Sequence, residues 1–294
     1  MKNKTIIIDG NNLLHRAYNK YKSMRSDDGK LTGSIFGFPY ILRSLIRLHS
    51  PTKVIVVFDG GRDKRRLKLL PDYKKRKIRE DFDYENFISQ KEEVMKILSF
   101  LCIEVLHNKN FEADDLIWLV ARKYSRKGKV MIVSSDKDFI QLIDKQISIW
   151  NPWKDDRITH LNYKKHYKFS PEQCVDYLSL DGDTSDNIPG YKGVGEKTAL
   201  AFLDEYGSID NYLSDLSLPE HKKIKRKELK ALYKVNKEII DVKLFCKKHK
   251  IKLKDCKTKT SKKIDIKELR LLCSKYSITS IIKDDFIQTF KQIA

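Results

Sequence analysis

The sequence predicts an α/β fold with a parallel sheet, followed by a mostly helical part. In the first half, short β-branched runs alternate with longer stretches whose apolar residues have helical spacing, which is the rhythm of βαβ units. After about residue 170 the strand signals fade, and Pro171 opens a segment with helical patterns. We therefore expect an α/β core over residues 1–169 and a helical domain over residues 170–294.

The predicted strands are short apolar runs of the kind that is buried on both faces of a parallel sheet. They lie at Thr5–Ile8, Lys53–Phe58 and Lys129–Val133. Between them, residues 34–49 and 87–101 place apolar side chains three or four positions apart, which predicts two amphipathic helices.

The composition points to a polyanionic partner. Sixty Lys and Arg against forty Asp and Glu give a formal charge of +20 over 294 residues, and such an excess attracts nucleic acid. Lysine-rich surfaces also occur simply because they keep proteins soluble. One basic stretch, residues 62–79, is too long for a tight connection, so it is either a functional loop or a disordered segment.

Cysteine usage and hydropathy indicate the compartment. The five cysteines are far apart and lack the paired spacing of a zinc site or a disulfide framework, so we expect reduced thiols. No apolar run approaches the roughly 20 residues of a membrane span, and the amino-terminal run is too short for a signal peptide. We expect a soluble, cytoplasmic protein that does not associate with membranes.

Acidic residues follow each predicted strand. In a parallel sheet the carboxyl ends of the strands share one edge, where ligands bind, so these acids should converge. A helix expected to start near Ala113 brings further carboxylates from its first turn, where the helix dipole favours them. The complete set is Asp9, Asp59, Glu112, Asp114, Asp115, Asp136 and Asp138.

Carboxylates gathered in this way need a counter-charge. Two of them ~4 Å apart repel by roughly 1 to 4 kcal/mol, so they must hold protons or cations. Any one of them alone is more simply a helix cap or a turn residue. Without His or Cys nearby, oxygen ligands favour Mg²⁺ or Mn²⁺ over zinc. A second pair, Asp183 and Asp186, is spaced for one helical turn and would complete a two-metal site for phosphodiester hydrolysis.

The segment GYKGVGEKTA at residues 190–199 predicts a glycine hairpin. A glutamate separates its last glycine from the lysine, and no buried strand leads into it, which excludes a Walker A loop. Gly193 and Gly195 leave backbone N–H groups open to a phosphate, and Lys197 and Thr198 open the next helix. We expect a clamp on duplex backbone that does not read sequence; an ordinary turn is the alternative.

Six segments form an ordered series: IIIDGNNLLHRAY, VVFDG, LLPDYKKRK, FEADDLI, SSDKDFIQLI and GDTSDNIPGYKGVGEKTA. Together they resemble the 5′-nuclease family, which includes the 5′-3′ exonuclease domain of bacterial DNA polymerase I and stand-alone phage flap endonucleases. The resemblance covers nearly the whole chain. It implies a resolvase-like (PIN-like) α/β core, a helical arch at about residues 62–86 and a helix-hairpin-helix module.

The resemblance also implies roles for particular residues. One Mg²⁺ ion would be held by Asp9, Asp59, Glu112 and Asp114, with Asp115 beside it, and a second held or oriented by Asp136, Asp138, Asp183 and Asp186. The arch and gateway positions, which grip or stack on the 5′ strand and steady the scissile phosphate, correspond to Arg66, Tyr73 and Lys74. The DNA contacts would be made by Arg16, Lys77, Gly193, Gly195, Lys197 and Thr198, with K⁺ bound at the hairpin. The family commonly has Arg at the position of Lys77. Arg binds a phosphate through two parallel N–H groups, whereas Lys binds it as a point charge.

We therefore expect a Mg²⁺-dependent nuclease, with Mn²⁺ as a substitute, that cuts DNA with a 5′ flap or a 5′ single-stranded end, or an RNA/DNA hybrid. Its role would be replication or repair, including the removal of RNA primers, as a monomer that works with a replication polymerase or a single-strand-binding protein. One rival is a PIN-type ribonuclease, although such domains are usually shorter and lack the hairpin and the basic insertion. The other is a non-catalytic DNA-binding protein on a nuclease scaffold, which would be expected to have lost some of the acids.

Overall fold

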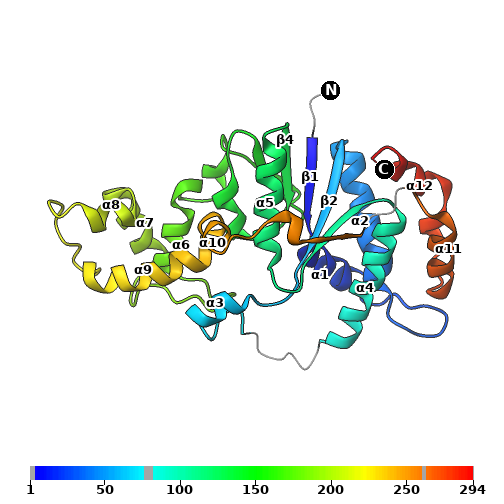
Figure 1. Cartoon of the computed structure of the whole chain (residues 1–294), viewed down its shortest axis with the longest axis horizontal. Coiled ribbons are helices and arrows are strands. Elements are labelled where there is room, and N and C mark those ends of the chain that lie inside the picture. The colour runs from blue at the N-terminus through cyan, green and yellow to red at the C-terminus, as the bar shows by residue number, and fades with distance from the viewer. Residues whose placement is uncertain (1–3, 76–81, 260–262, 294) are drawn as a thin grey trace.

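The computed structural model describes residues 4–75, 82–259 and 263–293. A sheet lies at the centre of the molecule, one group of helices extends from one end, and a smaller carboxyl-terminal group covers the other end (Figure 1). The expected DNA contact at Lys77 and the middle of the expected arch lie outside the described residues.

The sheet has seven strands in the order β6-β5-β4-β1-β2-β3-β7. The five inner strands are parallel, and β6 and β7 pair antiparallel at the two edges. The strands are β1 (Lys4–Asp9), β2 (Lys53–Phe58), β3 (Glu104–His107), β4 (Lys129–Val133), β5 (Ile147–Asn151), β6 (Asp156–Ile158) and β7 (Lys257–Lys259). The three predicted strands are confirmed as β1, β2 and β4. Strands β3, β6 and β7 were not predicted because each has only three or four residues, and β5 was not predicted although it is as long as β4.

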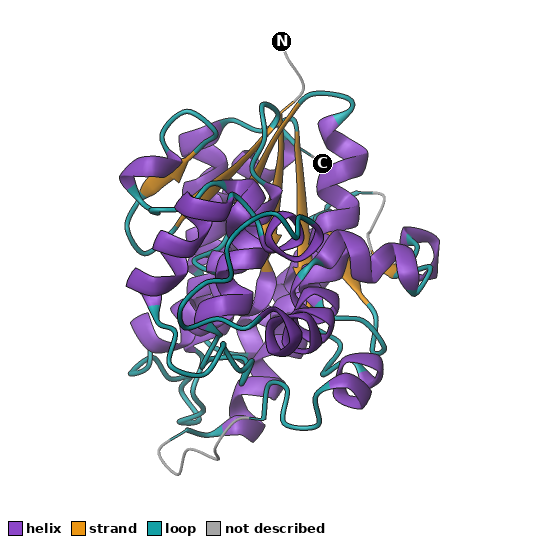
Figure 2. Ribbon diagram, turned by 90° about the vertical axis from the view of Figure 1, so that its left-hand side faces the viewer, coloured by secondary structure: helices purple, strands orange, loops and turns teal. Residues whose placement is uncertain are grey.

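Helices pack on both faces of the sheet (Figure 2). Those of the first half are α1 (Gly10–Lys20), α2 (Gly33–His49), α3 (Lys64–Leu69), α4 (Tyr84–Phe100) and α5 (Ala113–Ser125), so the helices predicted at 34–49 and 87–101 are confirmed as α2 and α4. Those of the second half are α6 (Cys174–Asp181), α7 (Glu196–Tyr206), α8 (Ile209–Ser214), α9 (Arg226–Ile240), α10 (Val242–Lys248), α11 (Ile266–Lys275) and α12 (Asp284–Lys291). A short 3₁₀ helix, η1 (Lys137–Leu142), follows β4.

Alternation along the strands divides the core into two layers. On β1, Ile6 and Ile8 face the layer that contains α1, α2 and α4, while Ile7 faces the layer that contains α5. All three side chains are buried, as expected for a strand covered on both faces.

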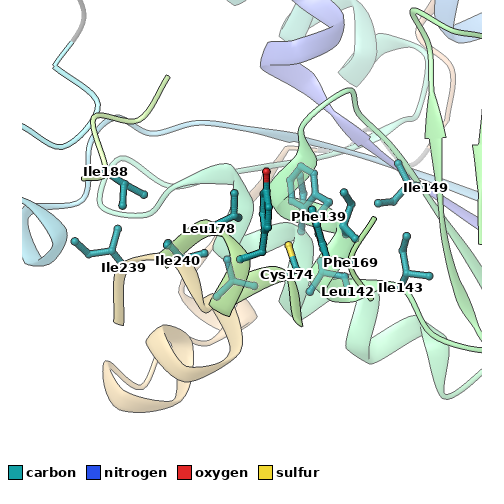
Figure 3. Close-up of a cluster of buried hydrophobic side chains, with 14 of the residues drawn as sticks. Phe139, Leu142, Ile143, Ile149, Phe169, Cys174, Leu178, Ile188, Ile239 and Ile240 are labelled. Atoms are coloured by element: carbon teal, nitrogen blue, oxygen red, sulfur yellow. The ribbon is translucent and has the colours of Figure 1, made fainter. Parts of the chain in front are cut away.

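A buried cluster joins the sheet to the helical part (Figure 3). Phe139 of η1, Ile149 of β5, Leu178 of α6 and Ile240 of α9 belong to this one cluster. The helical part therefore shares a hydrophobic core with the sheet, which fixes the orientation of α6 and the loop after it relative to the strand ends.

The carboxyl-terminal segment returns to the sheet. Strand β7 pairs with β3, and Leu269 of α11 and Phe290 of α12 are buried in the layer that contains α2 and α4. The sequence carries no interpretable motif after about residue 250, and the structure shows that residues 263–293 pack on the core. All five cysteines are free thiols. Within the ranges described above, no helix is long and apolar enough to cross a bilayer.

Candidate active site

Acidic side chains meet at the carboxyl-terminal edge of the sheet. Asp9 is the last residue of β1, Asp59 follows β2 directly, and Asp136 follows β4, which is parallel to β1. Asp114, in the first turn of α5, interacts electrostatically with all three of these carboxylates. The parallel topology therefore gathers at one edge acids that are more than 100 positions apart in the sequence.

Glu112 lies at the start of α5 but does not cap this helix. Its Oε1 accepts a hydrogen bond from the backbone N–H of Asp63 (3.0 Å), and its Oε2 accepts one from the Tyr73 hydroxyl (2.9 Å) and one from Lys74 Nζ (2.8 Å). Burial would raise the pKa of Glu112, but the charges of Lys74 and Arg66 outweigh it and lower the pKa to about 2. Glu112 is thus a fully ionised carboxylate whose charge is already matched.

Lys74 bridges α5 and the loop after α6. Its Nζ lies 2.8 Å from Glu112 Oε2, 3.2 Å from Asp114 Oδ2 and 3.5 Å from Asp186 Oδ2. Its backbone N–H donates to the carbonyl of Asp186 (2.9 Å), and Asn187 Nδ2 donates to the carbonyl of Lys75 (2.7 Å). Burial would lower the pKa of Lys74, but the surrounding acids, Asp114 first, raise it well above its ordinary value. The ammonium group therefore stays charged at this edge of the sheet.

Arg66 is an interior residue, which differs from the expected contact with the 5′ strand. Its side chain is 1% exposed, and NH1 and NH2 each lie 2.8 Å from a carboxylate oxygen of Asp115. Its Nε donates to the carbonyl of Ile239 (3.1 Å), and the guanidinium carbon lies 3.6 Å from the centre of the Phe245 ring. The planar guanidinium forms a bidentate pair with Asp115, so this arginine joins α3, α5 and the helical part.

Two further predicted residues are also enclosed. Asp115 is 0% exposed, and both of its carboxylate oxygens pair with Arg66. Tyr73 is buried, and its hydroxyl donates to Glu112 instead of being open to a DNA strand. In this arrangement Tyr73 and Arg66 hold the acids in place.

Among the described residues, the hydrogen-bond donors to the side chains of Asp9 and Asp59 are all neutral. Asp9 accepts from the backbone N–H of Asn12 (3.0 Å) and from the Ser134 hydroxyl (2.8 Å), and Asp59 accepts from Asn11 Nδ2 (2.8 Å) and from the backbone N–H of Ala113 (2.7 Å). Burial raises the pKa of Asp9 to about 8, with a further contribution from the charges of Asp114 and Asp59. Burial likewise raises the pKa of Asp59.

Asp136 and Asp138 repel each other at the start of η1. Asp136 caps this helix by accepting from the backbone N–H of Asp138 (2.9 Å). The surrounding protein, and then the charge of Asp114, raises the pKa of Asp136 to about 6. Burial and the charge of Asp136 raise the pKa of Asp138 well above its ordinary value. The Oδ1 atom of Asp138 is buried and has no hydrogen-bond partner among the described residues.

The second acidic pair lies in a tight turn, not on the helical turn that the spacing predicted. Asp183 and Ile188 form an antiparallel bridge that closes the turn, and Gly182 and Asn187 have positive φ angles of 85° and 54°, which interrupt a helix. Asp183 accepts from the Ser185 backbone N–H (2.8 Å) and hydroxyl (2.6 Å). The turn directs Asp186 toward Lys74, and burial, with Asp114 among the charges that add to it, raises the pKa of Asp186 to about 7.

Comparison with known proteins identifies the family. Residues 4–175 match the model of the 5′-3′ exonuclease N-terminal resolvase-like domain, and residues 169–265 match that of the 5′-3′ exonuclease C-terminal SAM fold. This chain belongs to the 5′-3′ exonuclease family. It is therefore a nuclease, and the expected resolvase-like α/β class is confirmed.

Curated relatives and solved structures agree with this assignment. The chain is 34% identical over 250 residues to the 5′-3′ exonuclease of Aquifex aeolicus (strain VF5), which covers 84% of this chain and 86% of that protein. It is 33% identical over 218 residues to DNA polymerase I of Mycobacterium tuberculosis (strain ATCC 25618 / H37Rv), covering 72% of this chain but only 24% of the polymerase. The bacteriophage T5 flap endonuclease, in a complex with DNA and metal ions, has the same fold, with a TM-score of 0.70 at 20% identity and coverage of 99% and 98%.

The exonuclease-family site has the chemistry that a divalent ion needs. Asp138 Oδ1 is a buried oxygen without a donor among the described residues, and burial, together with the charges of neighbouring carboxylates, raises the pKa of Asp9, Asp138 and Asp186. Within the described ranges, no three acidic, His or Cys side chains are arranged as a ready-made ion site. The donors are oxygens only, which suits a hard cation such as Mg²⁺. The residues present therefore fit a divalent metal, and binding it would draw the carboxylates inward.

The glycine hairpin lies between α6 and α7 as the sequence predicted. Gly193 has a φ of 76°, and a Cβ added at Gly193 or Gly195 would meet no atom within 4 Å, so the backbone there is open to solvent. Lys197 is exposed in the first turn of α7, and Thr198 is half-buried. The remaining predicted DNA contact among the described residues, Arg16, is half-buried on α1, where its guanidinium carbon lies 5.0 Å from the centre of the Trp153 ring.

Two residues at this exonuclease-family site were not predicted. Ser134 is buried between two acids: its hydroxyl donates to Asp9 Oδ2 (2.8 Å) and accepts from the backbone N–H of Asp136 (3.1 Å). Its position directly after β4 is the signal that could have identified it. Lys91 of α4 donates from Nζ to the backbone carbonyl of Asp59 (2.9 Å), and burial lowers its pKa. In the sequence Lys91 resembles any lysine on the exposed face of a helix.

Proposed function

We propose that this family member is a Mg²⁺-dependent nuclease that hydrolyses DNA phosphodiesters at 5′ ends and 5′ flaps, close to the junction of single strand and duplex. One observation carries the proposal: carboxylates that form no ion pair among the described residues gather around Asp114 at the edge of the sheet, and Asp114 itself lies 3.2 Å from Lys74 Nζ. A site that only held structure together would match those charges, as the protein does for Asp115.

We propose that two Mg²⁺ ions, for which Mn²⁺ substitutes, are bound by acids on both sides of Lys74. When bound, such ions neutralise the scissile phosphate and lower the pKa of the attacking water. Asp9, Asp59 and Asp114 belong to the β1, β2 and α5 side, and Glu112 supports them through its bond to Lys74. The acids of the other side are Asp136, Asp138, Asp183 and Asp186.

Lys74 has a part of its own in the proposed reaction. Its ammonium holds three carboxylates together, and its raised pKa keeps it charged through the neutral range. Once cations neutralise those carboxylates, the ammonium can turn toward the phosphodiester and hold a non-bridging oxygen as a point charge. Lys74 has a positive φ of 50°, and its backbone N–H donates to the carbonyl of Asp186. The backbone at Lys74 is thereby held against the loop that contains Asp186.

Shape, and not base sequence, would select the substrate. The exposed hairpin at Gly193–Gly195 offers backbone N–H groups to a duplex phosphate, with K⁺ as the proposed bridging ion and Lys197 and Thr198 beside it. The basic stretch that begins at Arg62 contacts the acids where Lys74 pairs with Asp114. It would guide a single 5′ strand toward them. The T5 relative in its crystal structure is a complex with DNA and metal ions.

A role in replication or repair follows from the relatives. We propose that the chain removes flaps and RNA primers as a cytoplasmic monomer, acting on RNA/DNA hybrids as well as DNA. In the DNA polymerase I relatives a matching segment makes up about a quarter of a longer protein. We therefore propose a replication polymerase as the first partner to test, and a single-strand-binding protein as the second.

The test is Asp136→Asn, with Asp284→Asn on α12 as the matched control. Asp136→Asn should lower cleavage of a 5′-flap DNA in Mg²⁺ by about 100-fold or more, because one ligand of a metal site is lost, while binding in EDTA stays within a few-fold. Asp284→Asn removes an exposed carboxylate on a helix packed against α2 and should change neither. Gel cleavage of the flap, its RNA analogue and intact duplex measures this. Wild-type cleavage by Asp136→Asn at saturating Mg²⁺, or preference for the RNA analogue, contradicts the proposal.

A further inference from the structure

The carboxylate of Asp138 is held in place less directly than those of Asp9 and Asp59. Its Oδ1 atom is buried and receives no hydrogen bond among the described residues, whereas Asp9 and Asp59 each accept from two donors. The backbone N–H of Asp138 donates to Asp136 (2.9 Å), and its backbone carbonyl accepts from Gln141 Nε2 (2.9 Å). The position of this carboxylate therefore depends on the backbone of η1 and on the side chains that fix that backbone.

The side chain of Gln141 joins η1 to the helical part. Its Nε2 also donates to the carbonyl of Ile240 (3.0 Å), and its Oε1 accepts from the backbone N–H of Val242 (3.2 Å). Ile240 ends α9 and Val242 begins α10, so the amide pairs with the backbone on both sides of the break between these helices. The last carbonyls of a helix have no partner within the helix, and Gln141 supplies one here. One planar amide thus joins two segments that are 99 positions apart.

Helix α9 also holds the second segment that carries acids. Asn236 of α9 is fully buried, and its Nδ2 donates to the carbonyl of Pro189 (2.7 Å). Pro189 comes directly after the turn that contains Asp183 and Asp186. The two segments that carry the acids on this side of the site are therefore bonded to one helix, η1 through Gln141 and the turn through Asn236.

We propose that Gln141 is a positioning residue for the nuclease reaction. By bonding η1 to α9, its amide keeps the carboxylate of Asp138 at a fixed separation from Asp183 and Asp186. This proposal rests on the proposed function, since it assumes that these acids hold one metal ion together. Mg²⁺ demands near-ideal ligand geometry at about 2.1 Å, so a η1 that moves relative to the turn would hold the ion poorly. Binding of duplex DNA at the hairpin would not change.

The experiment compares Gln141→Met with Gln173→Met, since methionine has a similar length but forms none of these hydrogen bonds. Gln173 makes the same set of bonds with segments that carry none of the acids. Its Nε2 donates to the carbonyls of Leu203 (3.4 Å) and Gly207 (3.0 Å), and its Oε1 accepts from the backbone N–H of Ser170 (3.2 Å). Both glutamines are half-buried. The two variants should therefore lose similar amounts of unfolding free energy in EDTA.

Turnover and the Mg²⁺ requirement should separate the two variants. In Gln141→Met the kcat for a 5′-flap DNA should fall about tenfold or more, and the Mg²⁺ concentration at half-maximal cleavage should rise about tenfold, as expected when a residue that orients a metal ligand is lost. The KM for the flap DNA should stay close to that of the wild type, because the hairpin is unchanged. Gln173→Met should match the wild type in kcat and in the Mg²⁺ requirement.

A second variant separates the hydrogen bond from charge. Gln141→Glu keeps the acceptor for Val242 but cannot donate to Asp138, and its added negative charge would by itself attract Mg²⁺. A raised Mg²⁺ requirement in Gln141→Glu therefore supports the proposal, and a lowered one overturns it. The proposal is also overturned if Gln141→Met and Gln173→Met have the same kcat and the same Mg²⁺ requirement.

A readout without cleavage keeps this test apart from that of the proposed function. If the wild type cleaves no flap DNA, the proposed function fails, and the Mg²⁺-induced rise in the unfolding temperature still tests Gln141. A smaller rise in Gln141→Met than in Gln173→Met supports its positioning role, and an equal rise overturns it.

Discussion

Two groups of carboxylates share one edge of the sheet and differ in their counter-charges. The matched group, Glu112 and Asp115, is bound by Lys74 and Arg66. The unmatched group, Asp9, Asp136 and Asp138, forms no ion pair within the described ranges. The charges of Lys74 and Arg66 lower the pKa of Glu112 to about 2, whereas burial raises the pKa of Asp9 to about 8 and also raises that of Asp115 despite its pairing with Arg66. The paired carboxylates thus stabilise the fold, whereas the unpaired carboxylates repel one another in the absence of a cation.

The largest effect should come from breaking the matched group. Arg66→Met leaves Asp115 buried without a partner, which costs about 3 to 5 kcal/mol of unfolding free energy. Arg122→Met is the control, because Arg122 is partly exposed and only 3.6 Å from Asp144, where an ion pair contributes about 0 to 1 kcal/mol. Urea unfolding followed by circular dichroism measures both. Equal losses for the two variants would mean that the Arg66–Asp115 pair has no special role.

The sequence predicted the gathering of acids well, because that follows from strand topology. Asp9 and Asp59 come at the ends of apolar runs that only a doubly covered parallel sheet can bury, so their meeting depends on no distant detail. The turn at Asp183 was harder, since a spacing of three fits either a helix or the bridge to Ile188.

The sequence did not show which acids would be matched. Arg66 lies in a basic run that resembles a solvated loop, and its partner Asp115 is 49 positions away. Only the folded chain brings α3 against α5 and Phe245, where the guanidinium is enclosed. Long-range pairing of this kind depends on packing between elements, which local patterns do not encode.

Adding Mg²⁺ should relieve the unmatched group and stabilise the protein. At 100 times its dissociation constant, an ion that binds only the folded state adds about 2.7 kcal/mol, equivalent to a rise of about 5 °C or more in the unfolding temperature. We expect this rise at pH 8 in a thermal scan with and without Mg²⁺. An unfolding temperature that does not rise in Mg²⁺ would contradict the assignment of these acids to a metal site.

The Mg²⁺-induced rise in the unfolding temperature should increase with pH. Folding raises the pKa of Asp9 to about 8, of Asp186 to about 7 and of Asp136 to about 6, above the unfolded value of about 4. The folded state then holds more protons than the unfolded state between pH 4 and 8, so the metal-free protein loses stability as the pH rises through that window. Mg²⁺ needs the ionised carboxylates, so its stabilising effect should be larger at pH 8 than at pH 5.5. Glu112 does not oppose this trend, because its stabilising contribution is lost only as the pH falls from about 4.5 toward 2.

The sharpest test makes one chemical change in each group. Asp138→Asn removes a buried charge that repels Asp136, and should stabilise the metal-free protein by about 1 kcal/mol. Asp115→Asn makes the identical change beside Arg66 and should destabilise it by about 3 kcal/mol, because the arginine loses its counter-charge. Urea unfolding in EDTA gives both values. The two changes in unfolding free energy have opposite signs only if the presence or absence of a counter-charge distinguishes the two groups of carboxylates. A loss of stability in both variants would refute that distinction.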